Sequence, residues 1–277
     1  MPLAIDFGFP IPQVLTLLSY AAALTTRVRL GVSVLVFPIR NPVHVAKIVS
    51  TLDNLSAGRM ILGIGLGHVM APDFFRTYGV DNREAVRRFN EGVRVLKSLW
   101  TEPVTNFAGE FYQLQRAGMW PKPVQKPHVP LWFGGQHPDA LRRAVRHADG
   151  YTCAGPNTTD EFAGFVGQIR QFLDEEGRDP ATLPLSKRVY LAIDDDEARA
   201  KRRLDEFFAS RYPWQIQRNP DFVADICVWG RTARVAAGLA RVARIGASTI
   251  ITNPLWDFEE QLEALASEVI PAVRALL

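Results

Sequence analysis

The stretch Gly58-Arg59-Met60-Ile61-Leu62-Gly63-Ile64-Gly65-Leu66-Gly67-His68 sets the organisation expected for this chain. It follows Ser56-Ala57, a sequence typical of a helix end, and continues as a short apolar strand. The strand ends in alternating glycines and a histidine. A strand that lacks side chains at its carboxyl end allows a flat or anionic ligand to approach the backbone closely. The stretch therefore predicts a buried strand whose last residues could contact a ligand.

The three glycines at positions 63, 65 and 67 do not form a dinucleotide-binding fingerprint. The pattern G-x-G-x-x-G would need a third glycine where this chain has Met70. No strand that ends in an acidic residue follows about 20 residues later, as a Rossmann domain requires. A Rossmann domain is therefore disfavoured. Glycines that merely ease the packing between strand and helix remain the alternative interpretation.

Apolar runs of strand length alternate with helical patterns along the chain. The expected strands are residues 3–9, 30–37, 60–66, 130–135, 150–156, 187–193 and 248–252. The expected helices are residues 15–26, 83–100, 139–147, 159–176, 197–208, 232–245 and 259–276, with one more that begins at Asn41-Pro42. Such alternation predicts a parallel sheet, and the unbroken pattern favours a (β/α) barrel over an open doubly wound sheet. In such barrels the ligand site lies at the carboxyl ends of the strands.

We expect one α/β domain over residues 1–277, a TIM-type (β/α)8 barrel. Two segments, 101–129 and 210–229, depart from the alternation and carry several aromatic residues. Segments of this length between regular elements are often functional. We expect both to be insertions over the rim that shape the substrate pocket, the first of them as a hairpin.

Composition and charge narrow the class of protein. With 277 residues and 47% hydrophobic residues, the chain can bury a large core. It has neither an apolar run of about 18 residues nor a signal-peptide pattern, so we expect a cytoplasmic protein without a membrane span. The net charge of +3 comes from basic residues interspersed with acids, which disfavours nucleic-acid binding. Cys153 and Cys227 lie in apolar runs and are expected to be buried free thiols.

Two further strand ends carry small residues. Gly134-Gly135 and Gly155-Pro156 each follow an apolar run and precede a helical pattern. Backbone N–H groups in such turns, at the starts of the following helices, can bind a phosphate without a charged side chain. Two such turns at neighbouring strand ends favour a phosphate site, and two ordinary tight turns are the alternative.

The candidate for acid–base chemistry is His68, which follows the glycine series directly. It is either a proton donor with a pKa suited to neutral pH or an ordinary loop histidine. The other four histidines fall in helical or loop patterns, namely His44, His128, His137 and His147. No residues have metal-ligand spacing and no serine lies in a nucleophile turn, so we expect no metal and expect an organic cofactor to supply the chemistry.

Several segments together resemble the bacterial luciferase-like monooxygenase family of flavin- and coenzyme F420-dependent oxidoreductases. The residues that carry the resemblance are Thr26–Gly31, Pro38–Pro42, Thr51–Arg59, Leu62–Gly67, Pro121–Pro123, Pro130–Gly135, Ala148–Gly150 and Gly177–Pro180. They occur in the family's order along nearly the whole chain. The resemblance is specific for the family and says little about the substrate.

The resemblance implies a flavin or deazaflavin bound at the strand ends of a (β/α)8 barrel. It implies that the peptide at Ser33-Val34 backs the ring of the cofactor and that the phosphate lies at the later strand exits. The implied cofactor-binding residues are Ser33, Val34, Gly65, Leu66, Gly67, Gly134, Gly135, Ala154, Gly155 and Pro156. The implied reaction on a small organic substrate is hydride transfer with coenzyme F420, which we prefer, or oxygen activation by reduced flavin mononucleotide (FMN).

The chain departs from the family pattern near its N-terminus. About seven strands can be counted where the family has eight, and the Asp-His pair that often contacts the ring does not follow residues 3–9. The alternative is therefore a truncated, catalytically impaired barrel that binds a cofactor or a partner without turnover. An incomplete barrel leaves strand edges or apolar faces open, from which we expect a homodimer.

Overall fold

The computed structural model describes residues 13–67 and 72–277. The chain divides into two compact units, residues 1–135 and residues 136–277, which are described here one at a time. The strand expected at 3–9 and the candidate catalytic residue His68 both lie outside the described residues. The expectation that residues 1–277 form a single domain stays a prediction.

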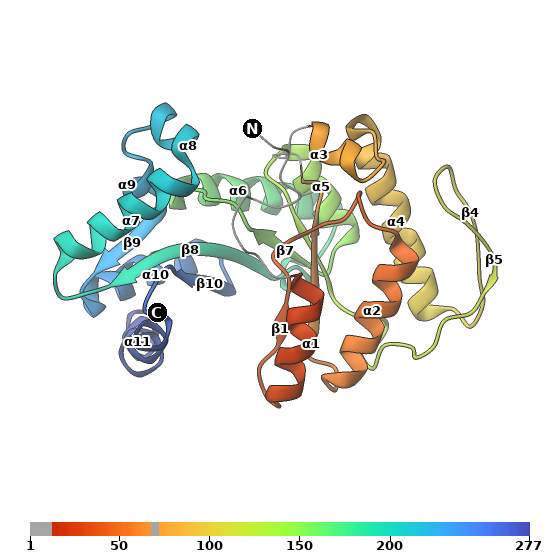
Figure 1. Ribbon diagram of the computed structural model, residues 1–277, viewed down its shortest axis with the longest axis horizontal. Helices are drawn as coiled ribbons and strands as arrows, with labels where there is room; N and C mark the ends of the chain where they lie inside the picture. The colour runs from red at the N-terminus through yellow and green to blue at the C-terminus, as the bar shows by residue number, and fades with distance from the viewer. Residues whose placement is uncertain (1–12, 68–71) are drawn as a thin grey trace. The chain divides into compact units, whose positions relative to one another are not determined.

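The first unit contains helices and mostly parallel strands in alternation. Its elements are α1 (Val14–Leu24), β1 (Leu30–Gly31), β2 (Leu35–Val36), α2 (Pro42–Leu55), β3 (Met60–Gly65), α3 (Pro72–Thr77), the 3-10 helix η1 (Asn82–Glu84), α4 (Ala85–Thr101), β4 (Thr105–Ala108), β5 (Gln113–Ala117) and β6 (Leu131–Gly134). Helices α1, α2 and α4 lie side by side (Figure 1). The alternation agrees with the pattern predicted from the sequence.

The central strand of the first unit is β3, the strand of the glycine stretch. On one edge it pairs in parallel with β1 and β2, and on the other edge with β6. Ile64 shows both contacts, because it pairs with Leu35 on one side and with Phe133 on the other. Met60, Leu62 and Ile64 are all fully buried, as the apolar run predicts.

The expected strand at 30–37 is broken into two short strands, and this corrects the prediction of one continuous strand. Residues 32–34 separate β1 from β2, and the peptide between Ser33 and Val34 is cis. Pairing with β3 resumes at Leu35. An uninterrupted β-branched run gives no sign of this break, because all its residues favour strand geometry.

Helices α2 and α4 cover the sheet with apolar faces. In α2, Val45, Val49 and Leu52 are buried, whereas Ile48, expected on the same face, is 43% exposed. Asn41 caps this helix by accepting from the N–H groups of residues 43 and 44, which explains why the helix begins at Pro42. The buried face also includes Ala46, Ser50 and Asp53, so it is centred away from position 48, which lies beyond its edge.

Arg59 ties the start of β3 to the end of α1. Its Nε donates to the Ser56 carbonyl at 2.7 Å, and its two terminal nitrogens donate to the last turn of α1 and the following loop. The acceptors are Ala22 O (3.1 Å), Thr25 O (2.7 Å), Thr25 Oγ1 (2.9 Å) and Val28 O (2.7 Å). Carbonyls at a helix end lack hydrogen-bond donors within the helix, and the guanidinium of Arg59 supplies these donors.

The segment 101–129 forms the predicted antiparallel hairpin, β4 with β5. Its turn lies against α4, because the buried Glu91 carboxylate accepts from three successive backbone N–H groups. The donors are Glu110 N (3.0 Å), Phe111 N (2.9 Å) and Tyr112 N (2.7 Å). A carboxylate that accepts several backbone donors makes strong charge-assisted hydrogen bonds. A position of this hairpin over a barrel rim stays a prediction.

Replacing Glu91 by glutamine should loosen the hairpin. The amide keeps one acceptor oxygen and turns its NH2 group towards backbone donors, which should cost about 2 kcal/mol of local stability. Limited proteolysis should then cut the turn around Glu110 faster than in the wild type. Glu102→Gln, at an exposed glutamate near the hairpin, is the matched control. Equal cleavage rates in both variants would contradict the role given to Glu91.

The second unit continues the alternation. Its elements are α5 (Pro138–His147), β7 (Gly150–Cys153), α6 (Thr159–Glu175), the 3-10 helix η2 (Pro180–Thr182), β8 (Leu185–Ile193), α7 (Glu197–Arg211), α8 (Pro213–Arg218), α9 (Phe222–Ile226), β9 (Cys227–Gly230), α10 (Thr232–Ile245), β10 (Thr249–Pro254), α11 (Phe258–Ala264), the π-helix η3 (Leu265–Val269) and α12 (Ile270–Leu276). The last three elements follow one another directly where one helix was expected.

Strand β8 is the centre of the second unit. Its first residues pair with β7 and its last residues with β9, while β10 pairs along the opposite edge. Leu191 shows the two edges, because it pairs with Val228 of β9 and with Pro254 of β10. In a barrel whose strands follow chain order, β9 would pair with β10. In this unit, β9 and β10 each pair with β8 instead.

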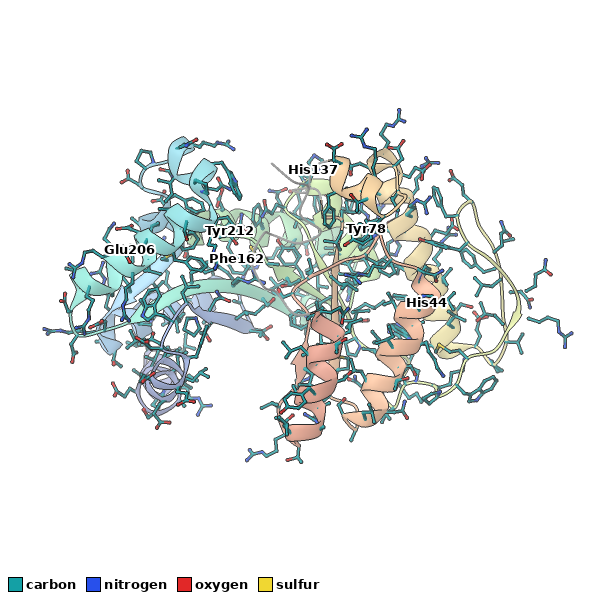
Figure 2. The ribbon with its side chains drawn as sticks, viewed as in Figure 1. His44, Tyr78, His137, Phe162, Glu206 and Tyr212 are labelled. Atoms are coloured by element: carbon teal, nitrogen blue, oxygen red, sulfur yellow. The ribbon has the colours of Figure 1, made fainter. Side chains whose placement is uncertain are left out.

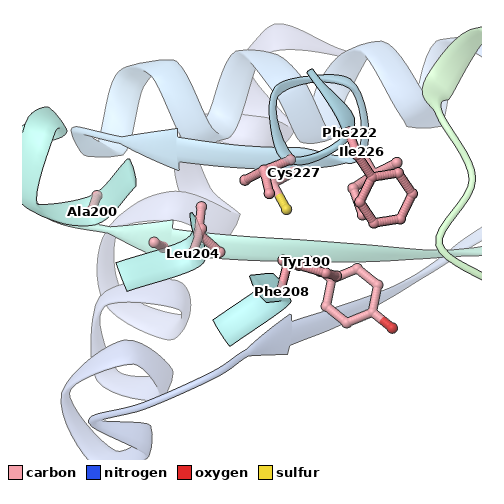
Figure 3. Packing of buried hydrophobic residues seen from close by; sticks show 9 residues of the cluster. Tyr190, Ala200, Leu204, Phe208, Phe222, Ile226 and Cys227 are labelled. Atoms are coloured by element: carbon pink, nitrogen blue, oxygen red, sulfur yellow. The ribbon is translucent and has the colours of Figure 1, made fainter. Parts of the chain in front are cut away.

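The segment 210–229 is more regular than the sequence predicts. Helices α8 and α9 and the start of β9 fall within it. It contributes α9 and the start of β9 to an apolar cluster in which Tyr190 of β8 meets α7 and α9 (Figure 3). Phe208 of α7 is fully buried there, with its ring centroid 5.1 Å from Tyr190 and 5.6 Å from Phe222. The irregular appearance arose because helices of five or six residues are too short to show a period.

Among the residues that the structure describes, no helix is both long and apolar enough to span a bilayer.

Candidate functional site

The exits of three parallel strands meet at one edge of the first unit's sheet. Phe37, just after β2, donates its N–H to the carbonyl of Gly65 at 3.0 Å. A side chain at Gly65 would lie 3.9 Å from the carbonyl of Gly134, the last residue of β6. The structure therefore brings together the ends of β2, β3 and β6, as a parallel sheet requires.

Most of the predicted cofactor residues at these exits are partly exposed. Within the first unit, Gly65 is buried, and the remaining predicted residues are partly exposed, namely Ser33, Val34, Leu66, Gly67, Gly134 and Gly135. The break between β1 and β2 thus exposes the Ser33-Val34 peptide. A ligand could reach all these residues except Gly65 from solvent.

The glycine series has a packing reason inside the first unit. A Cβ on Gly63 would lie 1.8 Å from the Val32 carbonyl oxygen. A Cβ on Gly65 would lie 2.8 Å from the Val34 side chain, and one on Gly67, where φ is +72°, would lie 2.5 Å from Val36. The lack of side chains at these glycines thus leaves room for the neighbouring broken strand. The spacing of the glycines in the sequence does not reveal this packing role. Contact of Gly65 and Gly67 with a cofactor stays a prediction.

The exit of β7 in the second unit is organised around Asn157. Its amide oxygen accepts from Gln136 Nε2 at 2.9 Å and from the Cys153 thiol at 3.3 Å, and its own N–H donates to Gly155 O at 3.0 Å. Its carbonyl accepts from Lys187 Nζ at 2.7 Å. Asn157 is buried, whereas Ala154, Gly155 and Pro156 are partly exposed. The turn therefore presents its backbone to solvent over a buried polar network.

Lys187 is buried near the start of β8, with 1% of its surface exposed. Besides Asn157 O, its ammonium donates to the carbonyl of Arg188 at 3.2 Å and lies 6.0 Å from the ring centroid of Phe162. Burial lowers the pKa of Lys187, because desolvation disfavours the charged form. A buried ammonium held by carbonyl oxygens is an unusual and costly feature.

The helix starts beside these turns are poorly suited to an anion. Helix α5 has Pro138, which lacks an N–H group, at its first position, and His137 Nδ1 accepts from Asp139 N at 3.3 Å. Helix α6 is closed by a capping box in which Thr158 N donates to the Glu161 carboxylate at 2.7 Å. Acidic residues in both first turns oppose a phosphate there. A phosphate would therefore have to bind to the turns themselves.

The described histidines occupy helix and loop positions, as expected. His44 lies exposed on α2 and His137 caps α5, and both are labelled in Figure 2. His128 is buried, with Nδ1 3.0 Å from the Val129 carbonyl, and His147 ends α5. Within residues 13–67 and 72–277, no group of three His, Cys, Asp or Glu residues could hold a metal ion.

Both cysteines should resist thiol reagents in the native protein. Each is a buried free thiol, as predicted, and burial raises the pKa of Cys153 to about 11 and raises that of Cys227 further. A raised pKa lowers the thiolate fraction at pH 8, so labelling by 5,5′-dithiobis(2-nitrobenzoic acid) should be about a hundredfold slower than for free cysteine. Unfolding in guanidinium should release both thiols. Rapid labelling of one thiol in the native state would contradict this burial.

Sequence reasoning missed the network behind the β7 exit. Gln136 and Asn157 lie in the predicted strand-end segments 134–137 and 154–157 but were given no role, and Lys187 was not a candidate residue. One signal was available: Lys187 and Arg188 stand in a strand whose other residues, from Leu185 to Ile193, are mainly apolar, and a buried charged residue there needs a partner. Its partner could not be named, since Asn157 lies 30 residues earlier in the chain.

Comparison with known proteins decides the family. A family model described as luciferase-like monooxygenase matches residues 4–249. The chain belongs to this family. Over 191 residues the luciferase-like chain is 34% identical to an F420-dependent glucose-6-phosphate dehydrogenase of Kineococcus radiotolerans, a match that covers 68% of the chain and 56% of that relative. The chain thus spans little more than half the length of this relative.

A second relative uses a different cofactor. The luciferase-like chain is 25% identical over 269 residues to an FMNH2-dependent dimethylsulfone monooxygenase of Pseudomonas putida, covering 85% of the chain and 72% of the relative. Among solved structures, the monooxygenase RslO1 from Streptomyces bottropensis aligns with a TM-score of 0.80 at 23% identity, covering 94% of this chain and 83% of that one. This likeness confirms the predicted fold class, an α/β luciferase-like barrel of the TIM type.

Proposed function

We propose that the luciferase-like chain is a flavin- or coenzyme F420-dependent oxidoreductase that acts on a small organic substrate. Membership of a family whose matched relatives include an F420-dependent dehydrogenase and an FMNH2-dependent monooxygenase carries this proposal. The higher identity to the F420-dependent relative supports coenzyme F420 over FMN. The cytoplasm as its location and the lack of nucleic-acid binding are part of the same proposal.

An anionic cofactor fits the exit of β2. Arg40 follows this strand, and its Nε is buried without a hydrogen-bond partner among the described residues. Nε itself is shielded from a ligand, but the Arg40 side chain as a whole is partly exposed, and its positive charge would attract a phosphate or carboxylate near this strand exit. FMN and F420 both carry such groups. The residues proposed to hold the cofactor are Ser33, Val34, Gly65, Leu66, Gly67, Gly134 and Gly135 in the first unit and Ala154, Gly155 and Pro156 in the second.

When bound, such a cofactor supplies hydride transfer in the case of F420 or oxygen activation in the case of reduced FMN. The chain's own residues bind and orient it. The partly exposed backbone at the strand exits offers N–H and C=O groups on otherwise apolar strands, a combination suited to a flat, polar-edged ring. His68 remains proposed as the proton donor to the substrate, next to Gly67 in sequence.

Equilibrium titration tests the proposal. The purified chain is titrated with F420 and with FMN while cofactor fluorescence is followed. We expect saturable binding of F420 with a Kd below about 10 μM and weaker binding of FMN, a difference of about 1.4 kcal/mol for each tenfold step. Tighter binding of FMN would reverse the cofactor preference. No binding of either cofactor at tens of micromolar would end the proposal, and binding without turnover would favour the impaired barrel.

The chain is further proposed to form a homodimer through α1. This helix has no charged residue, and three of its apolar side chains are exposed: Leu17 (49%), Tyr20 (66%) and Leu24 (66%). A contiguous apolar face of this kind marks an interaction site.

Light scattering after size exclusion measures the oligomeric state directly. The wild type should give the mass of a dimer and Leu17→Glu/Leu24→Glu that of a monomer. Val124→Glu, at an apolar residue 50% exposed outside α1, is the control and should stay dimeric. A monomeric wild type, or a dimeric double variant, would refute the proposed interface.

A further inference from the structure

The buried Lys187 ammonium acts on the β7 exit turn through one residue. It donates at 2.7 Å to the carbonyl of Asn157, which closes the turn that begins at Ala154. The same Asn157 binds Gln136 and Cys153 through its amide oxygen and Gly155 through its N–H group. Four hydrogen bonds from different parts of the second unit thus converge on one buried asparagine.

This convergence fixes the shape of the short turn 154–157. The turn contains Gly155, whose backbone is conformationally free, and a Cβ there would lie 2.7 Å from Gln136 Nε2 and 3.0 Å from Asn157 Oδ1. The network therefore packs closely under the backbone of the turn. Without the ammonium, the Asn157 carbonyl would be buried with no charged donor, and the turn would gain alternative conformations.

A lysine at this place is costly for the fold alone. Leu191, four residues further along β8 and on the same face, is fully buried and apolar, so a charged side chain at position 187 stands out on this face. Removing this buried charge would end its desolvation cost but would also leave the carbonyls of Asn157 and Arg188 without their donor, so the two effects on stability oppose each other. The positive charge of Lys187 is thus better explained by its role in holding the turn 154–157 than by a contribution to stability.

We propose that Lys187 is a positioning residue, which through Asn157 holds residues 154–157 in the conformation that receives the anionic chain of the cofactor. The identity of the ligand in this inference rests on the proposed function, whereas the ordering of the turn by Lys187 does not depend on it. Lys187 touches neither cofactor nor substrate. It sets where the backbone groups of the turn point, and its buried positive charge makes the turn attractive to an anion.

The test compares Lys187→Met with the wild type in the full chain. Hydrogen exchange at the Asn157 amide, measured without cofactor, should accelerate about tenfold, because the turn loses its anchor. The Kd for F420 or FMN should rise about tenfold, the equivalent of one lost charged hydrogen bond. The midpoint of urea unfolding should change little, because removal of a desolvated charge offsets the loss of the donor to the two carbonyls. Lys201→Met, at a partly exposed lysine paired with Asp205 on α7, is the matched control and should change none of these quantities.

The outcomes distinguish a positioning role of Lys187 from a merely structural role. Unchanged exchange at Asn157 would overturn the proposal, and a lower unfolding midpoint with unchanged Kd would make Lys187 merely structural. Failure of the wild type to bind either cofactor would end the proposed function, while the exchange measurement would still decide the ordering of the turn. Should the methionine variant not fold, Lys187→Gln, which keeps a shorter donor, should show an intermediate acceleration of exchange, and no acceleration would equally overturn the proposal.

Discussion

Replacing Gly63 by alanine should destabilise the first unit by more than about 4 kcal/mol, enough to leave much of the chain unfolded. The added Cβ would lie 1.8 Å from the Val32 carbonyl oxygen, and a contact this short cannot be relieved by turning a side chain. The two backbones would have to separate where β1 gives way to β2, which would break the pairing of β3 with both. Urea unfolding followed by circular dichroism measures the loss.

The matched control for this variant is an alanine at a glycine with open space. Gly164, exposed in α6, has no atom within 4 Å of its would-be Cβ. Gly164→Ala should therefore stabilise the helix by up to about 1 kcal/mol, since alanine has the higher helix propensity. A Gly63→Ala variant as stable as the wild type would show that β3 does not approach residue 32 this closely.

Replacing Arg59 by alanine should cost about 3 kcal/mol. The substitution removes five hydrogen bonds to Ser56, Thr25, Val28 and Ala22 and leaves carbonyls at the end of α1 without partners. Because the guanidinium is planar and carries several donors, lysine should restore only part of the loss. The urea midpoint should fall most for Arg59→Ala and less for Arg59→Lys.

Arg27→Ala provides the comparison for Arg59, because Arg27 is an exposed arginine in the loop after α1. Its removal should change the free energy of unfolding by less than about 0.5 kcal/mol. Equal midpoints for Arg27→Ala and Arg59→Ala would contradict the capping role of Arg59.

Local sequence signals located most of the elements. Helix α10 was expected at 232–245 and spans Thr232–Ile245. Asn41-Pro42 marked the start of α2 because an N-cap followed by proline leaves few alternatives. The alternation of apolar runs and helical patterns also predicted the fold class. These features depend on residues that are close together in the chain, so the sequence alone is enough to predict them.

The features that escaped prediction depend on contacts between distant residues. The break at Ser33-Val34 follows from the approach of β3, and β9, with four residues, is too short to show a pattern beside α9. The importance of Asn157 comes from Lys187 and Gln136, which meet it through the fold. Likewise, the glycines at 63, 65 and 67 suggested a ligand, whereas the structure gives them Val32, Val34 and Val36 as neighbours.

The central claim is that a flavin-type cofactor binds at the strand exits, and hydrogen exchange with and without F420 tests it most directly. We predict that saturating cofactor slows exchange in the peptides that contain Ser33–Phe37, Gly65–Gly67, Gly134–Gly135 and Ala154–Asn157, while the hairpin β4–β5 is unaffected. Bound cofactor that leaves all four exits unprotected, or protects residues elsewhere instead, would contradict the claim.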